Sequence, residues 1–153
     1  MIPATAERVH RHTADHVNRE IRDVTEENVA RYAQGGPAAI EQRLAELDRE
    51  WDIERALEAN AATLALSGVV LGAAVDRRFL ILPPAVTAFL LQHALQGWCP
   101  PVPVFRRFGV RTATEINCER YALKYLRGDF RDAPPAGGSA SNRARQALAA
   151  MRI

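Results

Sequence analysis

The chain has 153 residues, a formal net charge of +2 and a charged fraction of 25%. This length suits a single domain, and the near-neutral charge gives no indication of nucleic-acid binding. Two cysteines, Cys99 and Cys118, are too few for a disulfide scaffold or a zinc cluster. The N-terminal segment lacks the apolar stretch of a secretory signal peptide, so we expect a cytoplasmic N-terminus.

Charge is distributed unevenly along the chain. Residues 59–75 and 79–105 contain no Asp, Glu, Lys or Arg, and only three residues separate these two apolar tracts. Such a partition is unusual for a soluble domain. We therefore divide the chain into four parts, which are a charged helical region (1–58), an apolar region (59–98), a Pro-rich exit with a basic amphipathic helix (99–131), and a flexible linker with a short helical tail (132–153).

The first part is predicted to be helical. Thr13 is a candidate N-cap for a first helix, with a kink or a second start near Thr25, and Gly35-Gly36-Pro37 ends one helix and begins the next. Beyond that point, apolar residues at i, i+4, i+7 and i+11 predict an amphipathic helix that runs without a breaker into the first apolar tract. These residues are Ile40, Leu44, Leu47 and Trp51.

Two segments carry opposite charge. Residues 41–58 have a net charge of −4, and residues 106–131 have a net charge of +4. The second segment contains a helix with a capping box, Thr112 with Glu115, and a glycine stop at Gly128. Both segments also have an apolar side, so we expect them to pack as a helical stalk of complementary charge. The competing prediction is two separately solvated faces, with exposed ion pairs worth about 0–1 kcal/mol each.

The two apolar tracts predict a transmembrane hairpin. As a helix, residues 59–75 would span roughly 25 Å, which is at the short end for a hydrocarbon core of about 30 Å. In the second tract Pro83 and Pro84 suit a first helical turn, so Phe79–Leu82 should lie at the interface ahead of a helix of about fifteen residues. Two alternatives remain open, a half-inserted hairpin and a soluble bundle with two apolar core helices.

Residues in and beside the tracts have the types expected at a membrane. Gly68 and Gly72 form a small-xxx-small pair, which favours close helix packing and a homodimer. Trp98 is placed as an interfacial anchor, and Arg106 and Arg107 as ligands of lipid phosphates. The arginines that flank the tracts favour both termini in the cytoplasm.

Residues 56–116 resemble the YgaP-like inner-membrane transmembrane domain family, through the glycine-containing first helix, the short turn, the exit "LQHALQGWCP" and the segment "VFRRFG". The resemblance covers about two fifths of the chain. It implies a two-helix hairpin, often homodimeric, in bacterial inner membranes. Some members carry a rhodanese domain that transfers sulfane sulfur through a loop cysteine. Residues 1–58 contain no cysteine and are predicted to be helical, so this activity does not carry over.

Cys99 is the candidate reactive thiol. At the membrane exit it could accept a persulfide or hold a soft metal ion, with nearby arginines favouring the thiolate; the simpler reading is a small buried apolar residue. His93 and Gln92 are candidates for polar contacts between helices. The sequence contains no nucleotide-binding loop, catalytic triad or paired carboxylates, so we predict no enzyme, no catalytic residue, no cofactor and no metal site.

Together these features predict an all-α protein with amphipathic N-terminal helices, a two-helix transmembrane hairpin and a C-terminal amphipathic helix. We expect a self-associating anchor or adaptor in the bacterial inner membrane, whose partners are the lipid bilayer and a cytoplasmic sulfur-handling protein. A thiol carrier or transport component that uses Cys99 is the first alternative, and a soluble helical bundle is the second.

Overall fold

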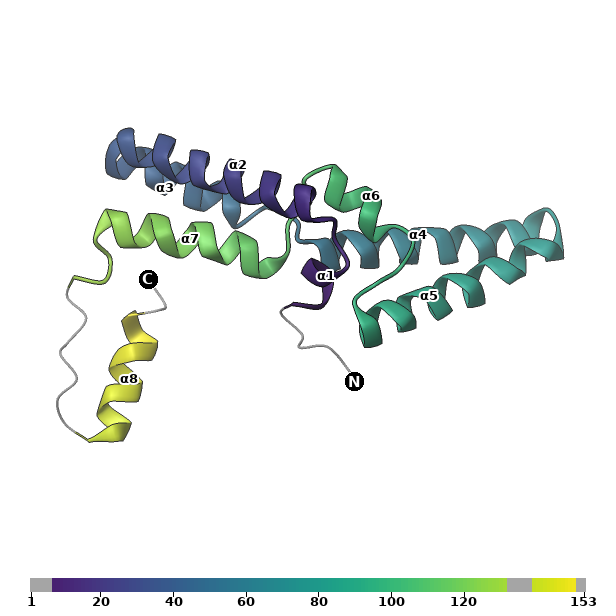
Figure 1. The fold of residues 1–153 in the computed structure, drawn as a ribbon. Coiled ribbons are helices and arrows are strands. Elements are labelled where there is room, and N and C mark those ends of the chain that lie inside the picture. Colours follow the sequence, from purple (N-terminus) through teal and green to yellow (C-terminus); the bar gives the residue numbers. More distant parts are fainter. Residues whose placement is uncertain (1–6, 132–138, 151–153) are drawn as a thin grey trace. The chain divides into compact units, whose positions relative to one another are not determined.

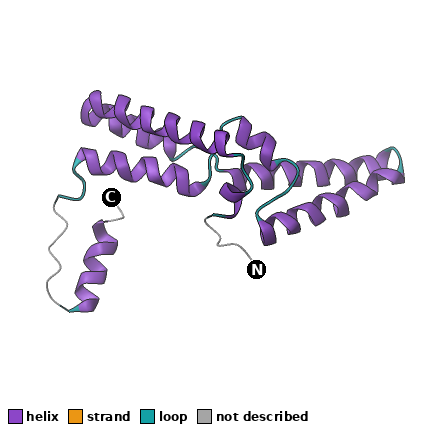
Figure 2. Cartoon of the chain, in the orientation of Figure 1, coloured by secondary structure: helices purple, strands orange, loops and turns teal. Residues whose placement is uncertain are grey.

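The computed structural model describes residues 7–131 and 139–150, and these are all-helical as predicted (Figure 2). Most of the linker predicted at 133–142, residues 133–138, and the tail residue Met151 lie outside the described residues, and the end of that predicted linker, residues 140–142, is helical in α8. The elements are α1 (Arg8–Arg11), α2 (Asp15–Gln34), α3 (Gly36–Leu47), α4 (Ile53–Ala74), the 3₁₀ helix η1 (Arg77–Ile81), α5 (Leu82–Gln96), α6 (Val102–Arg107), α7 (Ala113–Arg127) and α8 (Ala140–Ala150), and Figure 1 labels the α-helices.

The chain forms two compact units. The first, here called the hairpin unit, contains Met1–Val24 and Glu50–Ile116; the second, the charged-helix unit, contains Thr25–Arg49 and Asn117–Ile153. Helices α2 and α7 each contribute residues to both units.

Within the hairpin unit, α4 turns back through η1 into α5 (Figure 1). The turn is stabilised by Asp76, whose carboxylate accepts a hydrogen bond from the Arg78 backbone N–H at 2.8 Å. Two prolines occupy the first turn of α5, where their missing N–H groups leave no helical hydrogen bond unmade. Helix α5 has 15 residues, close to the length predicted after Phe79–Leu82.

The two glycines of α4 allow the hairpin to close. A Cβ atom at Gly68 would lie 2.8 Å from Pro83 Cδ, and one at Gly72 would lie 2.5 Å from Leu80 Cδ2. Both glycines are buried within this single chain. Their face is therefore filled by η1 and α5, and the close approach that the sequence predicts for a second copy is made inside the hairpin.

A small apolar core lies at the end of the hairpin where the chain enters α4 and leaves α5. It consists of Val9, Ile53, Leu57, Cys99 and Val102, each at most 3% exposed, with Phe105 and Val110 packed against it. The Ile53 backbone N–H also donates to the Arg111 carbonyl at 2.8 Å. Segments far apart in sequence are thus joined at the base of the hairpin.

The predicted continuous helix from Pro37 into the first apolar tract is wrong, because α3 ends at Leu47 and α4 begins at Ile53. Asp52 has an extended backbone and accepts the Arg55 N–H at 2.8 Å, so it is an N-cap that starts a new helix. Trp51 lies in the connection and is 49% exposed, with the Arg55 guanidinium 4.4 Å from its ring centroid. Ile40, Leu44 and Leu47 are buried as the pattern predicts.

Other helix boundaries test the remaining predictions of where helices begin and end. The capping box is present, since the Thr112 N–H donates to Glu115 at 2.7 Å and the Glu115 N–H to the Thr112 hydroxyl at 3.2 Å. Gly128, at φ 92°, follows α7 as predicted. Helix α2 continues through Thr25 without a break, and the Thr13 hydroxyl donates to the Val9 carbonyl rather than capping α2. Helix α6 is not predicted by the sequence analysis.

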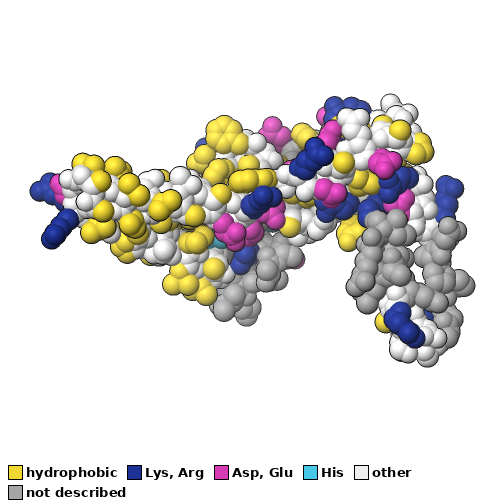
Figure 3. Space-filling model, turned by 180° about the vertical axis from the view of Figure 1, so that it is seen from behind, with side chains coloured by type: hydrophobic (Ala, Val, Ile, Leu, Met, Phe, Trp, Pro, Cys, Tyr) yellow, Lys and Arg dark blue, Asp and Glu magenta, His cyan; other side chains and the backbone are white. Residues whose placement is uncertain are grey.

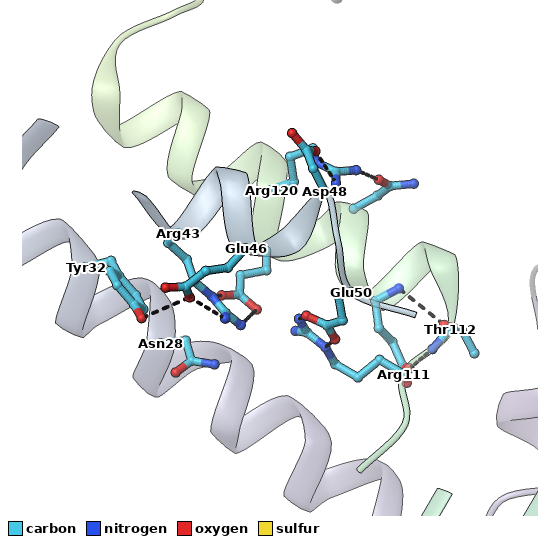
Figure 4. Close-up of polar contacts among 12 residues, drawn as sticks. Asn28, Tyr32, Arg43, Glu46, Asp48, Glu50, Arg111, Thr112 and Arg120 are labelled. Carbon is cyan, nitrogen blue, oxygen red and sulfur yellow. Dashed lines mark hydrogen bonds and ion pairs between the residues drawn. The ribbon is translucent and has the colours of Figure 1, made fainter. Parts of the chain in front are cut away.

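The charged-helix unit is held by ion pairs of the kind expected for the stalk (Figure 4). Arg43 Nε lies 2.7 Å from Glu119, which is fully buried, and Arg43 Nη1 lies 3.0 Å from Glu46. Arg120 pairs with Asp48 at 2.9 Å. The first pair reverses the expected polarity, because its arginine belongs to the acidic segment and its carboxylate to the basic one.

Replacing Gly68 by alanine distinguishes glycine packing inside the hairpin from an exposed glycine. On an exposed helix face Gly→Ala stabilises by about 1 kcal/mol. Here the added methyl meets a rigid proline ring, so we expect a loss of about 1–3 kcal/mol. Thermal unfolding in detergent, followed by circular dichroism, measures the sign. Ala73→Leu on the exposed side of α4 is the control and should change little. A higher melting temperature for Gly68→Ala would contradict the packing.

Candidate functional site

The surface of the hairpin, residues Ile53–Gln96, is apolar and exposed. Each of two segments contains an apolar stretch of 18 residues. Only 22% of that stretch is buried in α4, and only 6% of it is buried in the η1–α5 segment. By length and composition both segments could cross a membrane. Figure 3 shows hydrophobic side chains along this arm and charged groups only at its tip and base. The exposed large side chains include Leu64, Leu66, Val69, Val70, Leu71, Val75, Phe79, Leu80, Ile81, Phe89, Leu91 and Leu95.

The tip of the hairpin is cationic. Arg77 and Arg78 are exposed, and neither side chain has an ion-pair partner among the residues that the structure describes. The one carboxylate beside them, that of Asp76, caps the backbone of η1. Two guanidinium groups are therefore free to bind anions at the end of an apolar arm (Figure 3).

A charged cluster, here called the base cluster, joins α1, α4 and α5. The two carboxylate oxygens of Glu54 contact Arg8 Nη2 and His93 Nε2, both at 2.9 Å. Arg8 Nη1 also donates to the Ala94 carbonyl at 2.9 Å. His93 is 2% exposed, and its Nδ1, like Arg8 Nε, is buried with no hydrogen-bond partner in the described part of the chain. His93 therefore makes the polar interhelical contact that the sequence predicts, with a carboxylate that sequence reasoning missed.

A second cluster, here called the Arg106 cluster, surrounds a guanidinium that is 1% exposed. Its two terminal nitrogens each lie 2.7 Å from a different oxygen of Glu115. The remaining donors reach Thr13 Oγ1 at 3.2 Å, Asn18 Oδ1 at 3.0 Å and the Val110 carbonyl at 3.1 Å. All five N–H groups of an arginine are thereby used.

The position of Arg106 differs from the predicted membrane anchor. The guanidinium faces the interior of the hairpin unit, and its donors are committed to Glu115, Asn18, Thr13 and a backbone carbonyl, so none remains for a lipid phosphate. The side chain of its neighbour Arg107 is exposed, so this arginine stays a candidate ligand of a lipid phosphate. Arg106 and Arg107 are adjacent in the sequence. Successive residues of a helix point in different directions, so the first side chain is buried and the second is exposed.

The carboxylate that pairs with Arg106 is held ionised. Burial acts to raise the pKa of Glu115, but hydrogen bonds from Arg106 and from the Thr112 backbone outweigh it, and the pKa lies below its ordinary value. A second buried arginine, Arg111, pairs with Glu50 through two contacts of 2.7 Å. This pair joins the predicted acidic and basic segments within the hairpin unit (Figure 4).

Cys99 belongs to the apolar core rather than to a reactive environment. It is 3% exposed, and burial raises the pKa of its thiol. A raised pKa leaves little thiolate at neutral pH, which does not favour a persulfide carrier. Cys118 is exposed on α7. The described residues contain no group of three or more His, Cys, Asp or Glu side chains that could hold a metal ion.

The remaining predicted anchor, Trp98, is half-buried and follows the left-handed Gly97 that ends α5. This places an indole at the base of the hairpin, at the level where the apolar helices end. The two polar clusters were not predicted, because Arg8 and Asn18 belong to no motif and Thr13 was assigned only as an N-cap. An available signal was Glu54, an acid just over one turn before the first apolar tract, together with His93, the one histidine of the second tract.

No family model, no curated protein and no solved structure matches this chain. The resemblance to the YgaP-like transmembrane domain therefore stays a prediction.

Replacing Arg106 tests the buried cluster. Arg106→Met leaves Glu115 partly buried without its partner, and breaking such a pair costs about 3–5 kcal/mol. Arg107→Ala, the matched control on the same helix, should change stability by no more than about 0.5 kcal/mol because its side chain is exposed. Denaturant unfolding in detergent measures both. Equal effects of the two variants would contradict the structural role of Arg106.

The lowered pKa of Glu115 predicts a stability change in acid. The stabilisation is complete above the ordinary value of 4.5 and is lost as the pH falls through the lower pKa of the folded state. Glu115→Gln should therefore be less stable than the wild type at neutral pH, and the difference should shrink below pH 4.5. Glu26→Gln, at an exposed position of α2, is the control. A Glu115→Gln difference that stays constant with pH would refute the linkage.

Proposed function

We propose that this protein is an integral membrane protein whose hairpin inserts into a lipid bilayer and anchors the helical, charged remainder of the chain. The observation that carries the proposal is the exposure of the hairpin. A core helix of a soluble protein is mostly buried, whereas the apolar stretches of these two segments are only 22% and 6% buried. In water this surface would exceed the apolar patches that soluble monomers tolerate. In the hydrocarbon core of a bilayer the same surface would be in contact with apolar lipid chains.

The tip favours a hairpin that crosses the bilayer completely. In a half-inserted hairpin, Arg77 and Arg78 would lie near the bilayer centre, where an arginine costs at least about 2.5 kcal/mol by insertion scales. Helix α4 has 22 residues and is about 33 Å long; its uncharged part, residues 59–74, spans about 24 Å, which is at the short end for a hydrocarbon core of about 30 Å. With its base at one interface, the tip arginines reach the phosphates of the opposite leaflet.

A hairpin that crosses the bilayer twice would have both of its flanking segments on the same side of the membrane. The chain enters α4 and leaves α5 at one end of the hairpin, so residues before Ile53 and after Gln96 emerge on one side. We place that side in the cytoplasm of a bacterial cell, with the hairpin in the inner membrane; the inner-membrane assignment rests on the family resemblance. A cytoplasmic sulfur-handling partner also rests on the resemblance alone.

The geometry bears on three further predictions from the sequence. Self-association stays a prediction, and Gly68 and Gly72 do not carry it because η1 and α5 fill the space beside them. The thiol-carrier alternative is not favoured by the burial of Cys99. The soluble-bundle alternative would require another molecule to cover the exposed hairpin.

Membrane fractionation with an alkaline carbonate wash tests insertion. We expect the protein to remain in the pellet until detergent is added, because an inserted apolar hairpin is not displaced by raised pH. Release into the wash would contradict the proposal.

A cysteine at the tip tests complete crossing. Val75→Cys places a thiol at a residue that is 71% exposed, and the native Cys118 serves as the internal control. In spheroplasts an impermeant maleimide should label the tip at once and Cys118 only after permeabilisation. No labelling of the tip, or labelling only after permeabilisation, would indicate a half-inserted hairpin or the opposite orientation.

A further inference from the structure

We propose that a groove between α4 and α5 holds one acyl chain of a membrane phospholipid, with Asn60 binding the ester group. This inference rests on the proposed membrane insertion. The groove has a volume of about 250 Å³ and is lined by one face of each helix and by the segment Cys99–Pro101. On α4 the lining follows Leu57, Asn60 and Leu64, and on α5 it runs from Leu82 to Leu90.

The shape of the groove suits a chain better than a helix. Leu82 and Leu90 are eight residues apart on α5, which corresponds to about 12 Å along the helix axis. A volume of about 250 Å³ spread over that length is a narrow channel. An extended hydrocarbon chain fits inside such a channel, whereas a helix with its side chains, about 10–12 Å wide, could only lie across its open side.

The chemistry of the lining specifies the polarity of the ligand. Apart from Asn60, every lining side chain is apolar or is the Cys99 thiol. The Asn60 amide makes no hydrogen bond with another described residue, so its donors are available to a ligand. The groove therefore matches a molecule with a long apolar part and one hydrogen-bond acceptor at its end.

The depth of Asn60 identifies that acceptor. Asn60 is the second residue of the uncharged tract and lies six residues beyond Glu54 of the base cluster. At about 1.5 Å per residue, the amide lies about 9 Å beyond Glu54 and about 3 Å beyond Glu58, the last charged residue before the tract, so it lies at the boundary between the charged groups and the hydrocarbon, where glycerol esters are found. From Asn60 the groove runs past Leu64 toward the tip, which is the direction an acyl chain takes from its ester, while Leu57 and Cys99–Pro101 line its other end, toward the base. Leu64 and Phe89, both in the lining, are also 41% and 46% exposed, so the groove opens onto the lipid-facing surface.

Native mass spectrometry after reconstitution tests the site. The full chain is incorporated into bilayers of phosphatidylethanolamine and phosphatidylglycerol, transferred to detergent, and released from the micelle. We expect the wild type to retain one phospholipid. Ala85→Trp fills the groove from an exposed position in its lining and should lower the retained fraction about tenfold or more, since two or more methylene contacts are lost. Ala88→Trp, exposed on the same helix outside the lining, is the matched control and should retain the lipid.

A second variant isolates the head contact. Asn60→Leu keeps the apolar lining and removes the amide, so retention of phospholipid should fall several-fold while the melting temperature is maintained. Equal retention by the Ala85→Trp and Ala88→Trp proteins would overturn the site and indicate ordinary surrounding lipid. A dimer mass that Ala85→Trp abolishes would also overturn it, in favour of a second copy as occupant. Both results leave membrane insertion intact, because insertion is judged separately by the alkaline wash.

Discussion

The bidentate contact between Arg106 and Glu115 is the interaction on which the base of the hairpin depends. The guanidinium is 1% exposed and joins α6 to the start of α7, while its other donors reach Thr13 and Asn18 near the start of α2. A buried ion pair does little for net stability compared with an apolar replacement, but losing one partner is severe because a buried charge is left unpaired. We interpret the cluster as a device that fixes which segments meet at the base.

The Arg106 cluster is needed to hold the base together because the apolar core there is small. The buried apolar cluster at the base contains five residues, whereas most large hydrophobic side chains of the hairpin are exposed. In a bilayer the hydrophobic effect does not hold α4 against α5, so close packing and polar contacts must do so. Gly68 and Gly72 provide the close packing along the arm, and Glu54 with His93 provides the polar contact at its base. On the proposed insertion, the molecule thus uses one set of interactions toward lipid and another toward water.

The sequence predicts the features that depend on local physics. Helix class, the proline-marked start of α5, the capping box at Thr112 and the glycine stop at Gly128 follow from neighbouring residues, and all are present. The continuous α3–α4 helix was wrong because apolar spacing carried Trp51 into the pattern and the N-cap Asp52 was overlooked. The environment of Arg106 could not be predicted, since its partners lie 9, 88 and 93 residues away, and only the fold brings the distant two to it.

Depth measurement along α4 tests the membrane hairpin most directly. A single nitroxide at Leu66, which is 65% exposed near the middle of the helix, is introduced in a chain with Cys99 and Cys118 replaced by serine. In lipid vesicles the relaxation of the nitroxide is measured in the presence of oxygen, which concentrates in hydrocarbon, and then in the presence of a water-soluble nickel complex. The account predicts strong relaxation by oxygen and little by nickel. Strong relaxation by the nickel complex would show that this face of the hairpin is in water, and the membrane hairpin would be contradicted.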